Sequence, residues 1–131
     1  MVFDPAIAPR EQASFMAWYA QQTEWSEGHS YENSEITTPQ LRAWYDAMRE
    51  VWFPMNGPDS PWNGIPNDSP LWDDNRVTGY AIGRHVIYCN FRWSKAVEAR
   101  EAVVRLAEKH QVGFFDASGD GRIVFPGDRY I

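Results

Sequence analysis

The sequence predicts an α+β fold in which a mostly antiparallel sheet has helices packed on one face. The chain has 131 residues, which suits a single domain able to bury its own core. Segments with helical spacing of apolar residues and segments with strand-like alternation are grouped, in the order β-α-α-β-β-α-β-β. The β-β-α-β part of this order makes the predicted fold partly ferredoxin-like.

A short strand and an amphipathic helix are predicted at the start of the chain. The β-like segment MVFD stops at Asp4, because the residue before a proline avoids the helical region. Phe15, Trp18 and Tyr19 recur at helical spacing, which predicts a helix over residues 10–22. The polar segment 26–35 has no periodicity and is predicted to be a loop.

The second helix has a clear start signal. Thr38 suits the N-cap and Pro39 the first helical position, and an apolar stripe then continues to Trp52. The following segment, 54–75, holds five prolines and two glycines and is predicted to be one long loop. Loops of this length are usually functional or flexible, and this one contains Trp62 and Trp72.

A β-hairpin and a third helix are predicted next. Residues 76–93 read as two strands joined at Gly83-Arg84, because glycine at the first central position is typical of a type II′ turn. Ser94 is predicted to cap a helix over residues 95–110. The face of the second strand predicted to point into the core carries Ile87, Cys89, Phe91 and Trp93.

The last two predicted strands, VGFFDA and RIVFP, enclose a loop that resembles a calcium site. Asp116, Ser118 and Asp120 alternate before Gly121, as in an EF-hand loop. The twelfth position is Gly127, which has no carboxylate, and the flanks are strands where that motif requires helices. The loop is therefore predicted to be a β-turn, and no metal or cofactor is expected.

Isolated reactive residues do not form a recognisable catalytic set. The chain has no Walker loop, GxGxxG, GxSxG or HExxH motif. His29 lies among glutamates without a second histidine at metal-ligand spacing, so a solvated loop histidine is favoured over a metal ligand. Cys89, in mid-strand, is expected to be inert packing. Asp73 and Asp74 fit ordinary turn composition better than catalysis.

The charge of the chain is uneven. The net charge is −6, with 12 acidic and 3 basic residues in 1–75 and 6 acidic and 9 basic residues in 76–131. The acidic half argues against nucleic acid as a partner, and no apolar run has the roughly 18–20 residues that cross a bilayer. The start lacks a secretory-signal pattern and Cys89 has no second cysteine to pair with, so a cytoplasmic protein is expected.

Five short motifs are spread over most of the chain: Phe3-Asp4, TPQLRAW (38–44), SPW (60–62), RWS (92–94) and KHQVGFFD (109–116). Together these motifs resemble those of a group of small bacterial proteins. Proteins of this type are similar to the immunity partners of secreted bacterial toxins. The resemblance therefore implies a small acidic protein that binds a toxin, and it carries over no individual functional residue.

The leading hypothesis is a non-enzymatic protein-binding module, an immunity protein that neutralises a bacterial toxin by occlusion. Acidic groups would steer a basic toxin domain, and tryptophans would slow its release. The first alternative is a small enzyme that uses His29, Asp73 or Asp74 under the 54–75 loop. The second is a homo-oligomer, such as a homodimer, without a ligand. The residues expected to bind the partner are Trp62, Trp72, Asp73 and Asp74, with Glu27, Glu32 and Glu35 as rim charges.

Overall fold

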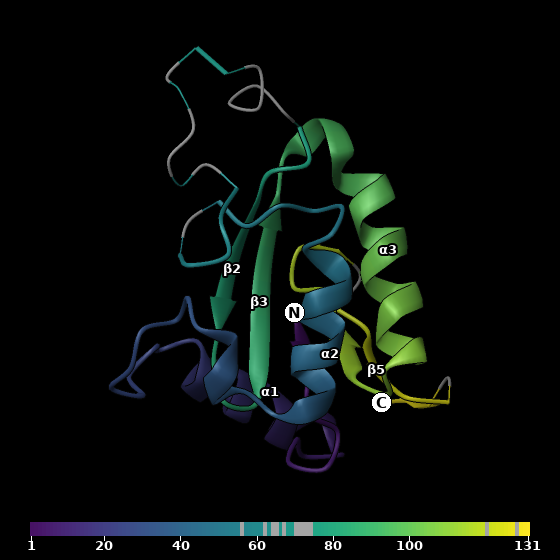
Figure 1. The fold of residues 1–131 in the computed structure, drawn as a ribbon. Helices are drawn as coiled ribbons and strands as arrows, with labels where there is room; N and C mark the ends of the chain where they lie inside the picture. The colour runs from purple at the N-terminus through teal and green to yellow at the C-terminus, as the bar shows by residue number, and fades with distance from the viewer. Residues whose placement is uncertain are drawn as a thin grey trace.

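The computed structural model describes residues 1–55, 57–61, 63, 66, 68, 69, 75–119, 121–127 and 129–131. The predicted α+β class is confirmed, and the short strand β6 extends the predicted order (Figure 1). Two 3-10 turns, η1 (Ser34–Ile36) and η3 (Trp93–Lys95), lie between the main elements. The main elements are β1 (Val2–Phe3), α1 (Gln12–Gln22), α2 (Pro39–Met48), β2 (Thr78–Ile82), β3 (Val86–Phe91), α3 (Ala96–Lys109), β4 (Gly113–Phe115), β5 (Ile123–Phe125) and β6 (Arg129–Tyr130).

The described strands form one antiparallel sheet with the order β2-β3-β1-β4-β5-β6. The two-residue strand β1 lies in the middle of this sheet. Val2 pairs with Ile87 on one side and with Phe114 on the other, so β1 joins the β2-β3 hairpin to the C-terminal strands. Because successive strand side chains point to opposite faces, Val2 and Phe3 enter two different cores.

The core on the first face is covered by α2 and α3, which lie side by side in Figure 1. Trp44 and Tyr45 of α2 are buried, and the Trp44 indole Nε1 donates a hydrogen bond of 3.3 Å to the Val103 carbonyl of α3. Tyr45 also contacts Tyr80 of β2, with ring centroids 5.1 Å apart in an edge-to-face arrangement. The predicted layer of helices on one face is formed by these two helices.

A second core lies on the opposite face of the sheet and is covered by α1. Phe15 is its buried centre, with its ring 5.0 Å from that of Phe3 and 5.5 Å from that of Phe115. Trp18 and Tyr19 of the same helix pack against this cluster and are partly buried. The helical spacing seen in the sequence therefore marks the core-facing stripe of α1, and the sheet is covered on both faces.

The β2-β3 hairpin differs from the predicted type II′ turn. The Gly83 N–H donates to the Val86 carbonyl at 2.8 Å, which places Arg84 and His85 at the two central positions. A type II′ turn needs a positive φ at the first central residue, whereas neither Gly83 nor Arg84 has one, so that prediction is wrong. Gly83 instead provides space, because a Cβ there would lie 2.8 Å from Oε2 of Glu27.

The loop between β4 and β5 has the predicted strands on both sides. The Asp116 carboxylate accepts a hydrogen bond of 3.1 Å from the Ser118 N–H, and Gly121 has a φ of +71°. A positive φ favours glycine, which explains this residue in the turn. In the described parts of the chain, no three His, Cys, Asp or Glu side chains are close enough together to hold a metal ion.

The described helices have at most 14 residues. The longest is α3, and none of the helices in the described ranges is both long and apolar enough to span a membrane.

Candidate functional site

The most exposed aromatic side chain described belongs to Trp93. It was predicted to continue the inner face of β3, but the strand ends at Phe91 and Trp93 begins the 3-10 turn η3. Its side chain is 93% exposed, so its predicted place in the core is wrong. The alternation of a strand stops where the backbone turns, and Arg92, which caps η3, marks that point. Ser94 lies inside the same turn, and Lys95 rather than Ser94 caps α3.

Trp93 stands at the edge of a hollow between β3, α3 and the β4-β5 loop. The hollow has a volume of about 290 Å³, and its apolar wall includes Phe91, Ala96 and Phe114. Arg100 and Asp116 supply charged groups to the same lining. A concave apolar surface with a few polar groups is the usual form of a binding site.

A second hollow of about 160 Å³ adjoins the first along α3. Arg100 and Phe114 line both hollows, and Val104 lines the second one. Val97 is 74% exposed and Val104 is 39% exposed, and these residues share a helical stripe with Arg100. We call Trp93, Val97, Arg100, Val104 and the two hollows the Trp93 surface.

Arg100 is the central charged group of the Trp93 surface. Its Nε donates to Oδ2 of Asp116 at 3.0 Å, and its guanidinium carbon lies 5.6 Å from the centre of the Phe114 ring. The Arg100 side chain is 54% exposed, whereas that of Asp116 is 19% exposed. Asp116 is thus held by Arg100 and the Ser118 N–H, while Arg100 still faces the solvent.

Cys89 lines the first hollow but is poorly suited to nucleophilic attack. It is half-buried against the α2-α3 core, and burial raises the pKa of its thiol. A cysteine nucleophile reacts as the thiolate, so a raised pKa disfavours that role. This agrees with the expectation of a packing residue.

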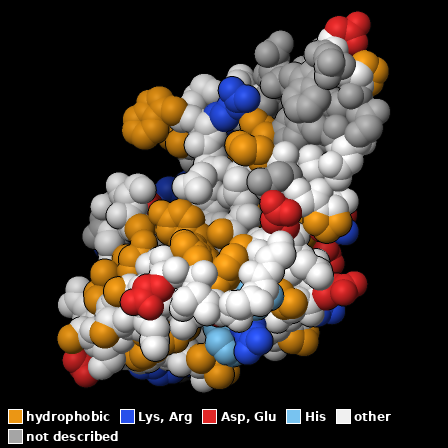
Figure 2. Space-filling model, turned by 90° about the vertical axis from the view of Figure 1, so that its left-hand side faces the viewer, with side chains coloured by type: hydrophobic (Ala, Val, Ile, Leu, Met, Phe, Trp, Pro, Cys, Tyr) orange, Lys and Arg blue, Asp and Glu red, His pale blue; other side chains and the backbone are white. Residues whose placement is uncertain are grey.

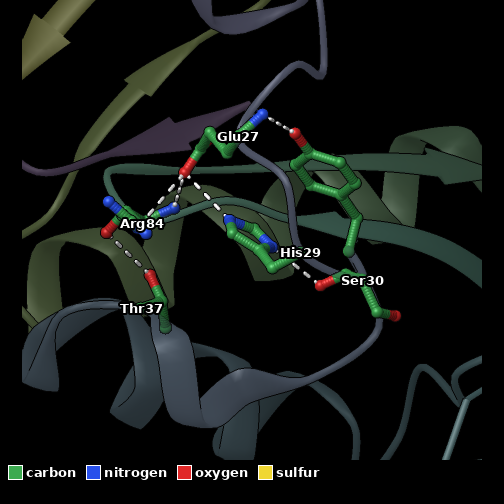
Figure 3. Close-up of polar contacts among 6 residues, drawn as sticks. Glu27, His29, Ser30, Thr37 and Arg84 are labelled. Carbon is green, nitrogen blue, oxygen red and sulfur yellow. Dashed lines mark hydrogen bonds and ion pairs between the residues drawn. The ribbon is translucent and has the colours of Figure 1, made fainter.

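A second polar cluster lies where the loop before α2 meets the β2-β3 turn (Figure 3). The Glu27 Oε1 is 3.0 Å from the His29 Nε2 and accepts a hydrogen bond of 3.1 Å from the Arg84 N–H. The Glu27 N–H in turn donates to the Tyr31 hydroxyl at 2.7 Å. We call the six residues drawn in Figure 3 the Glu27 cluster: Glu27, His29, Ser30, Tyr31, Thr37 and Arg84.

His29 is more enclosed than the predicted solvated histidine, and that prediction is wrong. Its side chain is 16% exposed, and its ring lies 4.7 Å from that of Tyr31. Its Nδ1 lies 2.9 Å from the Ser30 carbonyl oxygen and its Nε2 faces the Glu27 carboxylate. Because both partners are acceptors, the arrangement suits a ring in which both nitrogens carry a proton. The hydrogen bond to Ser30 and then that to Glu27 raise the pKa of His29, which favours the imidazolium form.

The structure describes only some of the predicted partner-binding residues. Trp62, Trp72, Asp73 and Asp74 lie outside the described residues.

Among the predicted rim charges, Glu27 turns inward to its cluster, whereas Glu32 and Glu35 are exposed. Gly57, with a φ of +86°, packs so closely on Glu32 that a Cβ there would lie 2.9 Å from the Glu32 Cβ. The structure therefore brings the start of the 54–75 segment against Glu32. On the face shown in Figure 2, acidic side chains are scattered among other groups rather than gathered in one patch.

No model of a known family matches the chain, and no match was found among the curated proteins or among the solved structures.

Proposed function

We propose that the chain is a non-enzymatic protein-binding module that contacts its partner through the Trp93 surface. The observation that carries this proposal is the 93% exposure of Trp93 beside an apolar hollow of about 290 Å³. Tryptophan is enriched among the residues whose truncation costs an interface more than about 2 kcal/mol, and such residues fill pockets near its centre. Exposed Val97 and Val104 extend the apolar area along α3.

The partner in this proposal is a bacterial toxin domain, which the module occludes in the cytoplasm. The resemblance to immunity proteins and the acidic balance of residues 1–75 support this part of the proposal. Exposed Glu32 and Glu35 would add to a negative field that speeds the encounter with a basic domain. The field would raise the association rate, and the Trp93 surface would supply most of the binding free energy.

Site-specific photo-crosslinking tests where the partner binds. A benzophenone amino acid replaces Trp93 in one variant and Met16 of α1, which is 40% exposed, in a matched control. We expect one partner protein to crosslink from position 93 and not from position 16. Equal products from both positions, or none from position 93, would contradict the assignment of this surface. A product of twice the mass of this chain would show self-association instead.

A growth assay then tests the inhibitory role. The crosslinked partner is identified and expressed in bacteria with the native chain or with the Trp93→Ala variant. We expect the partner alone to arrest growth, the native chain to restore growth, and the variant to fail. A partner that binds through position 93 without harming the cell would leave the binding function intact and would refute occlusion of a toxin.

A further inference from the structure

Arg100 belongs to both hollows of the Trp93 surface. It lines each of them together with Phe114, whose ring centre is 5.6 Å from the guanidinium carbon. A partner segment that fills both hollows would therefore come close to the guanidinium group of Arg100. The group on the partner that meets Arg100 is then constrained by what this guanidinium can bind.

The hydrogen-bonding capacity of Arg100 is largely unused. A guanidinium has five N–H groups, and Arg100 uses its Nε for Asp116. Its two terminal nitrogens form no hydrogen bond to any of the described residues. The guanidinium carbon lies 5.6 Å from the centre of the Phe114 ring and the side chain is 54% exposed, so a partner can reach the guanidinium. Two parallel N–H groups of this kind match the geometry of a carboxylate.

The charges around Trp93 also favour an acidic group on the partner. Arg92 is exposed and has no ion pair with the described residues, and Lys95 is 3.5 Å from Glu98. Asp116, the carboxylate within the first hollow, is already held by Arg100. The second hollow adds Arg122 and Glu108 to the lining, and Glu108 accepts a hydrogen bond of 3.2 Å from the Gly127 N–H. The described cations at the two hollows (Arg92, Lys95, Arg100 and Arg122) thus outnumber the described carboxylates (Glu98, Glu108 and Asp116), in contrast to the acidic balance of residues 1–75.

We infer that the Trp93 surface binds a protein segment in which an aspartate or glutamate lies between two apolar side chains. The apolar side chains enter the two hollows, and the carboxylate accepts hydrogen bonds from both terminal nitrogens of Arg100. This inference rests on the proposed function, since it describes the part of the partner that meets the Trp93 surface. A toxin domain with a basic surface can present one such acidic residue, so the long-range steering and the local contact are compatible.

A protein segment fits this surface better than a nucleic acid does. Phe91, Ala96 and Phe114 form apolar walls, which suit aliphatic or aromatic side chains. A nucleic acid would bring many phosphates to a chain with a net charge of −6, and its affinity depends on basic contacts along the backbone. The four cations at the two hollows, Arg92, Lys95, Arg100 and Arg122, offer few of these contacts.

A display selection with a random library of 12-residue peptides tests the inference. The library is selected in parallel on the native chain and on the Arg100→Gln, Arg105→Gln and Trp93→Ala variants. Arg105 is the matched control, because it is an exposed arginine of α3 outside both hollows. We expect the native chain to enrich peptides with an acidic residue between apolar ones. Arg100→Gln should weaken these peptides about tenfold, and Arg105→Gln less than twofold, since a tenfold change in affinity is about 1.4 kcal/mol, near the lower end of what a hydrogen bond to a charged group contributes.

The outcomes separate the inference from the function on which it rests. Two results would overturn the inference and leave the binding surface intact. In the first, the enriched peptides bind only when Trp93 is present but show no preference for an acidic residue. In the second, peptides selected on Arg100→Gln have the same acidic preference as those selected on the native chain. Enriched peptides that bind equally well to Trp93→Ala would overturn the proposed surface itself. A labelled single-stranded oligonucleotide that binds in a Trp93-dependent way, in place of any peptide, would also refute the inference. Circular dichroism of each variant confirms that it is folded.

Discussion

The Glu27 cluster and the Trp93 surface both place charged groups beside aromatic rings, but they use these groups in opposite ways. In the Glu27 cluster, one carboxylate oxygen serves both His29 and the Arg84 N–H, and the Tyr31 hydroxyl serves the Glu27 N–H. In the Trp93 surface, the Arg100 Nε–H donates to Asp116, and the Arg100 side chain is still 54% exposed. The first region pairs its charged groups with one another, although the buried Oε2 of Glu27 has no hydrogen-bond partner among the described residues. The second region keeps a guanidinium that is accessible to a partner.

The difference indicates which region stabilises the fold and which one is available to a partner. The Glu27 cluster connects segments far apart in the chain, since Arg84 and Glu27 are 57 residues apart. Thr37 adds a further link, because its hydroxyl donates to the Arg84 carbonyl at 3.2 Å. The Trp93 surface exposes large apolar groups to water, and this exposure does not stabilise the free chain. Such an exposed apolar surface is expected of an interface.

Within the Glu27 cluster and the Trp93 surface, the largest effect on folding is expected from Glu27→Ala. This change leaves the partly buried His29 imidazolium and the more exposed Arg84 N–H without their acceptor. Losing one partner of such hydrogen bonds costs about 2–3 kcal/mol of unfolding free energy. Urea unfolding measures this loss of unfolding free energy. Glu35→Ala is the control, because Glu35 is exposed and its replacement should change the unfolding free energy by less than about 0.5 kcal/mol. Equal losses in both variants would mean that the cluster does not stabilise the fold.

A somewhat smaller loss is expected from Gly83→Ala. The new methyl group would lie 2.8 Å from the Glu27 Oε2. Moving the carboxylate away would lengthen the hydrogen bonds of its other oxygen, Oε1, to His29 and Arg84. Overpacking of this kind costs about 1–2 kcal/mol. Gly79→Ala is the matched control in the same hairpin, because its methyl group would meet its nearest neighbour, in Asn90, at 3.9 Å. A loss in the control as large as at Gly83 would point to the hairpin backbone rather than to Glu27.

A smaller, pH-dependent effect is expected from His29. Its pKa is raised in the folded chain, so the stability that it contributes is complete below about pH 6.5, the pKa of an ordinary histidine. This stability is lost as the pH rises through the raised pKa. The groups that face His29 are Glu27, Tyr31 and, across the shared carboxylate, Arg84.

The measurement is the difference in unfolding free energy between the native chain and His29→Gln at several pH values. Both proteins keep His85 and His110, so the contributions of these residues cancel. We expect the native chain to be favoured near pH 6 and the difference to shrink by pH 8.5. A difference that stays constant or grows with pH would show that His29 is not held as the imidazolium.

Local patterns predicted most of the elements. The spacing of Phe15 and Trp18 marks the buried stripe of α1, and Thr38-Pro39 marks the start of α2. The β-patterned flanks correctly predicted the strands around the Asp116 loop. Each of these signals depends on neighbours within one or two turns of chain, where steric and hydrogen-bonding preferences are local.

Features that depend on distant neighbours were beyond these patterns. The central position of β1 depends on its pairing with both β3 and β4, and Gly83 depends on Glu27. The candidate site has the same property, because Arg100 and Asp116 come from different elements. Trp93 was misplaced for a different reason: alternation was extended past Arg92, although the strand-to-helix junction at RWS was visible.

The smallest effect on folding is expected from Trp93→Ala, and it makes the sharpest contrast between the two regions. Trp93 is 93% exposed and has little packing to lose, so the unfolding free energy should change by less than about 0.5 kcal/mol. Trp44→Ala is the matched substitution in the core, and it should cost about 3–5 kcal/mol, because Trp44 is fully buried and donates to Val103. If Trp93→Ala destabilised the free chain by more than about 1 kcal/mol, Trp93 would be part of the fold rather than a group kept available for a partner. A Trp93→Ala variant that folds normally but fails to restore growth beside the partner would separate the two roles, since exposure without a folding role is what a binding tryptophan requires.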